Sequence, residues 1–146
     1  LYFMQKGLVA EVETTIHARV DKVWEALTTP ALIKQYLFGT NVETDWEVGS
    51  PIMYRGEWQG EQYEDKGVIV ELDPEKRFVS TYWSSMSGKP DIEENYSTVV
   101  YELTAEDDDS TTLKITQDNN STEESREHSE KNWSSVLKGL KEMLEK

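Results

Sequence analysis

The most regular hydrophobic pattern in the chain lies at its C-terminal end, between residues 121 and 146. Six apolar side chains recur there at spacings of three and four residues, which places them on one face of a helix: Trp133, Val136, Leu137, Leu140, Met143 and Leu144. Ser121 is expected to cap this helix, and Glu124 would complete a capping box. A single helix with such a face must cover an apolar surface that other segments form.

Upstream of this helix, apolar and polar residues alternate with the period of two that is typical of strands. A first strand is expected over residues 7–16. Turn residues divide the middle of the chain into six more, at residues 41–46, 51–58, 63–72, 77–83, 95–104 and 110–117. The short connections between most of these strands favour antiparallel hairpins over parallel crossover units.

Two short helical patterns interrupt the strands, at residues 20–28 and at residues 30–38. Thr29 and Pro30 fit the N-cap and the first position of the second helix, and Gly39 fits its end. The predicted order is one strand, two short helices, six strands and one long helix. This is an α+β fold, in which a curved seven-stranded antiparallel sheet wraps around a long C-terminal helix.

Four motifs in this chain, taken in order and with their spacing, resemble those of a known family. They are VWEALTTP at residues 23–30, GVIVELDPEKRF at residues 67–78, the hairpin strands 99–104 and 112–116, and a closing segment that starts at Asn132 and Trp133. The chain resembles the START-like (SRPBCC, helix-grip) superfamily over residues 9–145. Within it, the chain resembles the group named for the activator of heat-shock protein 90 ATPase. The resemblance implies the helix-grip fold, a cavity between sheet and helix, and contact with a chaperone.

Composition excludes several classes of partner. The net charge is −14, from 29 acidic and 15 basic residues, so neither nucleic acid nor an anionic membrane is expected to bind. Without cysteine there are no disulfides or thiolate metal sites. We expect a cytoplasmic protein, monomeric or a weak homodimer, with one domain over residues 4–146. Residues 1–3 resemble the remnant of an expression tag.

Strand alternation predicts which side chains face the C-terminal helix; on the strand at residues 63–72 these are Val68, Val70 and Leu72. We expect a cavity there for a small, largely apolar or aromatic ligand, with the Tyr54 and Tyr82 hydroxyls as polar anchors. The candidate ligand-binding residues are Tyr54, Val70, Phe78, Tyr82, Val99, Tyr101, Ile115, Trp133 and Leu137. The alternative is a fully packed core, because five tryptophans and seven tyrosines also suit core filling.

Residues that could carry chemistry are few. The stretch from Arg55 to Asp65 contains four acidic residues, which could act in general acid–base catalysis at the mouth of a pocket. Arg55 and Glu57 have the parity opposite to Tyr54, so we interpret the stretch as a solvated face. Neither His17 nor His128 has a second histidine at ligand spacing. We therefore predict no metal, no cofactor and no catalytic residue.

Taken together, these features favour a ligand-binding or regulatory module without a defined catalytic activity. Two alternatives stay open. One is a protein-interaction module related to chaperone ATPase activation, which the family resemblance suggests. The other is a cyclase or lyase that acts in the cavity, which requires at least one ionisable side chain inside it.

Overall fold

The computed structural model describes residues 5–146, so the suspected tag remnant and Met4 lie outside the described residues. The order and type of the main elements are those expected from the sequence; a short 3₁₀ helix, η1 (Glu93–Asn95), is added before β6. The elements are β1 (Leu8–Ile16), α1 (Val20–Thr28), α2 (Pro30–Tyr36), β2 (Asn41–Thr44), β3 (Pro51–Trp58), β4 (Glu61–Asp73), β5 (Arg77–Tyr82), β6 (Ser97–Asp107), β7 (Ser110–Asn120) and α3 (Glu123–Leu144).

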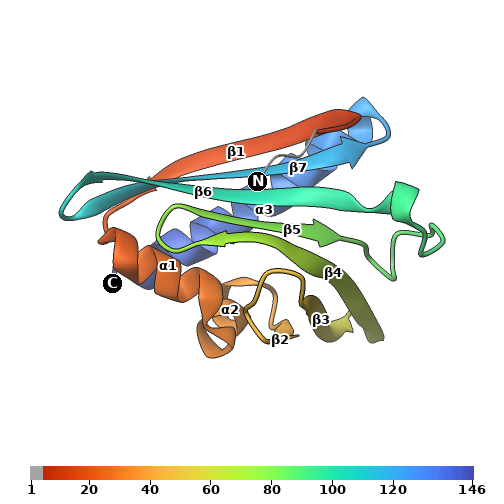
Figure 1. Ribbon diagram of the computed structural model, residues 1–146, viewed down its shortest axis with the longest axis horizontal. Helices are drawn as coiled ribbons and strands as arrows, with labels where there is room; N and C mark the ends of the chain where they lie inside the picture. Colours follow the sequence, from red (N-terminus) through yellow and green to blue (C-terminus); the bar gives the residue numbers. More distant parts are fainter. Residues whose placement is uncertain (1–4) are drawn as a thin grey trace.

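The seven strands form one antiparallel sheet in the order β1-β7-β6-β5-β4-β3-β2. In Figure 1, α3 crosses one face of this sheet, and α1 lies beside the C-terminal end of α3. This arrangement confirms the predicted α+β helix-grip architecture, including the two short helices between the first two strands.

The core lies between the concave face of the sheet and the C-terminal half of α3. Val136, Leu137 and Leu140 of α3 are buried there, as the periodicity predicts, together with Leu113 and Ile115 of β7. The main contacts of α3 are with β1 and β7, and with α1 and α2. The helix therefore lies toward the β1 side of the sheet, which leaves more room over β3, β4 and β5.

The expected parity of β4 is wrong for Val68 and Val70. Ile69 is fully buried, whereas Val68 is 42% exposed and Val70 is half-buried outside the core cluster. The cause is a bulge: Ile69 pairs with Ser80 but Glu71 pairs with Val79, so β4 has one extra residue. A bulge moves side chains to the opposite face beyond it, which is why Leu72 still packs on the core.

The cap of α3 is also one residue away from its expected place. Thr122, not Ser121, is the N-cap, and its Oγ1 accepts a hydrogen bond of 3.0 Å from the backbone N–H of Ser125. The predicted capping box between Ser121 and Glu124 is therefore wrong. Serine is slightly preferred over threonine as a cap, and Glu124 also favoured Ser121, so the local sequence indicated the neighbouring residue.

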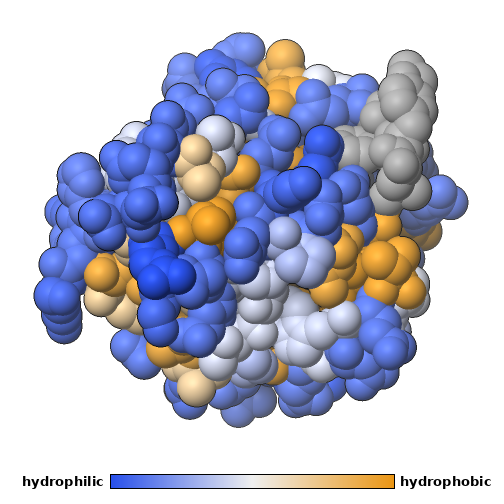
Figure 2. All heavy atoms as spheres, turned by 60° about the vertical axis from the view of Figure 1, so that its left-hand side comes forward, coloured by the Kyte–Doolittle hydropathy of each residue, from blue (hydrophilic) through white to orange (hydrophobic). Residues whose placement is uncertain are grey.

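The surface is strongly polar. Figure 2 shows hydrophilic side chains over most of one face, with small separate apolar patches. Within residues 5–146, no helix is both long and apolar enough to span a membrane.

Candidate functional site

A cleft of about 660 Å³ lies between the concave face of the sheet and the N-terminal half of α3, and it is partly open to solvent. Its walls come from β3 to β7, from the segment after α2, from the connection between β5 and η1, and from α3. The position of α3 explains the cleft. The helix packs on the sheet mainly through β1 and β7, so the concave face over β3, β4 and β5 is left open.

Five of the nine expected ligand-binding residues line this cleft: Tyr54, Tyr82, Val99, Tyr101 and Trp133. Phe78, Ile115 and Leu137 belong instead to the packed core. Val70 lies at the bulge in β4, outside both the cleft and the core cluster. The cleft is thus displaced toward the start of α3, so Leu137, one turn beyond Trp133, is already in packed surroundings.

Asp65 is a site residue that the sequence analysis placed on the solvated face. It is only 8% exposed and lines the cleft. Its Oδ2 accepts a hydrogen bond of 2.6 Å from the Tyr82 hydroxyl, and its Oδ1 accepts one of 3.1 Å from the Ser85 backbone N–H. Before the bulge, Asp65 shares the inward parity of Ile69. Counting alternate residues back along β4 from Ile69, rather than from Val70, would have placed Asp65 on the inward face.

The phenols beside Asp65 form one wall of the cleft. The Tyr54 and Tyr82 rings meet edge to face, with centroids 6.0 Å apart. Burial raises the pKa of Tyr54 from 10.0 to about 12, although a hydrogen bond with Ser80 acts in the other direction. Burial, followed by the neighbouring Asp65, raises the pKa of Tyr82 well above its ordinary value. Both hydroxyls therefore stay protonated, and can act as donors, at any physiological pH.

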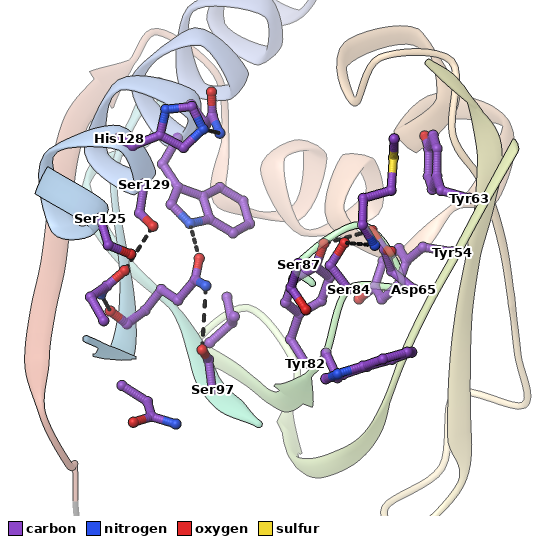
Figure 3. A pocket seen from close by; sticks show the side chains of 18 of the residues that line it. Tyr54, Tyr63, Asp65, Tyr82, Ser84, Ser87, Ser97, Ser125, His128 and Ser129 are labelled. Carbon is purple, nitrogen blue, oxygen red and sulfur yellow. Dashed lines mark hydrogen bonds between the residues drawn. The ribbon is translucent and has the colours of Figure 1, made fainter. Parts of the chain in front are cut away.

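A second polar wall lies opposite, on β6, β7 and α3. The Trp133 indole N–H donates a 2.7 Å hydrogen bond to Oε1 of Gln117, whose Nε2 donates to Oγ of Ser97 at 3.4 Å. The Trp133 ring meets Tyr101 edge to face at 5.8 Å. Figure 3 shows the two walls facing one another across open space: Tyr54, Asp65 and Tyr82 on one side, and Ser97, Ser129 and His128 on the other. The cleft is consequently more polar than the sequence suggests.

Two exposed aromatic side chains lie at the edge of the cleft. Phe38, after α2, and Trp58, at the end of β3, are 52% and 51% exposed, and their rings meet edge to face at 6.2 Å. Phe38 adopts a positive φ of 54°, which is uncommon for a residue other than glycine. The pair forms an apolar rim beside the polar interior.

The chemistry open to this site follows from its side chains. Among residues 5–146, no group of three or more histidine or acidic side chains is placed to hold a metal ion. Asp65 is a carboxylate inside the cleft, beside a phenol that donates to it. A cyclase or lyase reaction would need such an ionisable group, and a binding site would use the same pair to orient a ligand.

The raised tyrosine pKa values predict that stability falls between about pH 10 and pH 12. The unfolded chain releases phenol protons near pH 10, while the folded chain holds them to higher pH. The contribution of the buried phenols to the free energy of unfolding is therefore fully present below about pH 10 and is lost progressively as the pH rises toward about 12. The shift at Tyr54 alone corresponds to roughly 3 kcal/mol. Urea unfolding at several alkaline pH values would measure this, and Tyr54→Phe should flatten the curve. Equal slopes for both proteins would contradict the burial of this hydroxyl.

Comparison with known proteins gives the family. The sequence profile described as "Activator of Hsp90 ATPase homolog 1-like protein" matches residues 17–145. No curated protein matches this chain. The solution structure of ChR145 from Cytophaga hutchinsonii is 46% identical, covers 98% of this chain and 97% of its own, and superposes with a TM-score of 0.83.

More distant structures share the fold. The Aha1 dimer from Colwellia psychrerythraea is 20% identical, with 94% of this chain and 96% of its own covered and a TM-score of 0.72. CalU16 from Micromonospora echinospora is 21% identical, with 94% and 84% covered and a TM-score of 0.69. With the profile match over residues 17–145, the chain belongs to the family of activator of Hsp90 ATPase homolog 1-like proteins.

Proposed function

We propose that this protein binds a small molecule with an aromatic or apolar body and several polar groups in the cleft between the sheet and α3. The observation that carries the proposal is the convergence of buried polar groups on a space of about 660 Å³, which has the size of a ligand pocket. A packed core would fill such a space with apolar side chains instead.

The polar groups are held in place without a ligand. Asp65 is fixed by Tyr82 and by the backbone N–H of Ser85, and Gln117 is fixed by Trp133. Such preorganisation lowers the entropic cost of binding, because few side chains must be ordered when the ligand enters. The aromatic rings of the two walls supply the apolar area. This combination supports binding of a compact ligand that has hydrogen-bonding groups at both ends.

Blocking the cleft provides the test. Ser125 lines the cleft on α3 and is partly buried, whereas Ser134 is exposed on the same helix and does not line it. Ser125→Trp should therefore remove ligand binding, and the matched control Ser134→Trp should keep it. The measurement is native mass spectrometry of freshly purified protein, together with ligand-observed NMR against a library of small aromatic compounds.

We expect the wild-type protein and Ser134→Trp to retain the same bound molecules, and Ser125→Trp to lose them while its circular dichroism spectrum stays unchanged. If no compound binds wild-type protein at millimolar concentration, or if Ser125→Trp binds equally well, the cleft is not a ligand site.

A further inference from the structure

We infer that the ligand of this cleft carries a positively charged nitrogen, which pairs with the Asp65 carboxylate and lies against the surrounding aromatic rings. The inference rests on the proposed function and adds the chemical class of the ligand. Three features of the cleft carry it: a buried carboxylate without a cation, the rings beside that carboxylate, and the charge of the whole chain.

Asp65 has two hydrogen-bond donors but no cationic partner among residues 5–146. Its partners are the Tyr82 hydroxyl and the Ser85 backbone N–H. The next residue, Lys66, points away and pairs with Asp91 at 2.5 Å. Arg55 on β3 is likewise occupied by Glu43 and Glu64, at 2.6 and 2.8 Å. The basic side chains nearest along these strands are thus used elsewhere, and none neutralises Asp65.

An unpaired carboxylate is costly to bury, and a charged partner offsets much of that cost. Each carboxylate oxygen of Asp65 accepts one hydrogen bond and retains capacity for another. Because Asp65 lines the cleft, a ligand ammonium group can reach that remaining capacity. A ligand carboxylate would instead be repelled. Lys89 also lines the cleft, but no ion pair joins it to Asp65 among residues 5–146. At Asp65 itself, the geometry therefore favours an amine over an anionic group.

The aromatic side chains of the cleft suit the same group. Tyr54 and Tyr82 lie beside Asp65, and Tyr101 and Trp133 lie farther along the cleft. The faces of such rings carry negative potential and attract cations, with Trp and Tyr as good partners. The net charge of −14 adds a long-range attraction for cations and a repulsion for anions.

The test uses three probes of similar size and different charge: 2-phenylethylamine, 2-phenylethanol and 3-phenylpropionate. Their dissociation constants are measured by chemical-shift titration of ¹⁵N-labelled protein at neutral pH. We expect the amine to bind about tenfold more tightly than the alcohol, as a hydrogen bond with a charged partner supports, and the carboxylate to bind weakest. The shifted resonances should be those of the cleft.

Asp65→Asn keeps the shape of the side chain but removes its charge, and it replaces one of the two accepting oxygens by an amide NH₂ group. In this variant the amine should lose its advantage while the alcohol binds as before. The comparison within wild-type protein stands even if Asp65→Asn fails to fold. Repeating the titration at higher salt separates the site from general attraction to an acidic surface, since surface attraction is screened.

Each outcome decides between the two proposals. Equal binding of amine and alcohol by wild-type protein would overturn the charged-nitrogen inference and leave the ligand site intact. An amine that shifts only exterior resonances, and is released at higher salt, would also overturn it. If no probe and no library compound perturbs the cleft, the proposed function itself fails.

Discussion

Gly67→Ala is expected to destabilise the protein by about 3 kcal/mol or more, because the new methyl group has no room. An ideal Cβ on Gly67 would lie 1.7 Å from the Thr81 carbonyl oxygen and 2.5 Å from its carbon. Both are backbone atoms of β5, so no side-chain rotation relieves the clash. The measurement is urea unfolding followed by circular dichroism.

The close approach of β4 and β5 at Gly67 also positions the residues of the cleft. Lys66 and Trp83, on either side of this close approach, exchange two backbone hydrogen bonds of 3.0 and 2.8 Å. Asp65 and Tyr82 are the residues just before them, and these bonds hold the two side chains within hydrogen-bond distance. Any fraction of Gly67→Ala that folds should therefore also lose ligand binding.

Gly139→Ala is the matched control. Gly139 is in α3, and an ideal Cβ there would lie 3.5 Å from the nearest atom, the Cβ of Tyr36, which is ordinary contact. Alanine in a helix interior should raise stability by up to about 1 kcal/mol. If both substitutions have the same effect, the close approach of β4 and β5 at Gly67 is not real.

Leu140→Ala is expected to lower the free energy of unfolding by about 2–5 kcal/mol, the usual range for a leucine truncated in a packed core. Leu140 is fully buried between α3 and the sheet. The exposed Lys138 on the same helix provides the control, and Lys138→Ala should change stability by less than about 0.5 kcal/mol. A near-neutral Leu140→Ala, measured by urea unfolding, would mean that α3 does not close the core.

The fold could be predicted because its patterns are long and mutually consistent. The period of α3 correctly placed Val136, Leu137 and Leu140 in the core, and alternation placed Leu113 and Ile115 there. Alternation failed on β4, where a single extra residue at the bulge reverses the faces. Val, Ile and Val at residues 68–70 are equally apolar, so hydrophobicity alone could not show which of them points inward.

The site was harder to predict than the fold. Asp65 was assigned to solvent because the outward parity of Arg55 and Glu57 was extended to the whole stretch up to Asp65, although Asp65 is on the next strand and lies in the cleft. The position of the cleft depends on how α3 lies on β1 and β7, which no local pattern encodes. The structure shows that five of the expected residues line the cleft, namely Tyr54, Tyr82, Val99, Tyr101 and Trp133. Their role in ligand binding, like contact with a chaperone, stays a prediction.

The central claim is that the cleft anchored by Asp65 and Tyr82 receives the ligand of this protein. The most direct measurement is a high-resolution crystal structure of the protein grown with 2-phenylethylamine, or with whatever molecule co-purifies. We predict ligand density between β4 and the N-terminal half of α3, with a polar atom within hydrogen-bond distance of Asp65 or the Tyr82 hydroxyl. A cleft closed by its own side chains, or a ligand bound elsewhere on the molecule, would contradict the account.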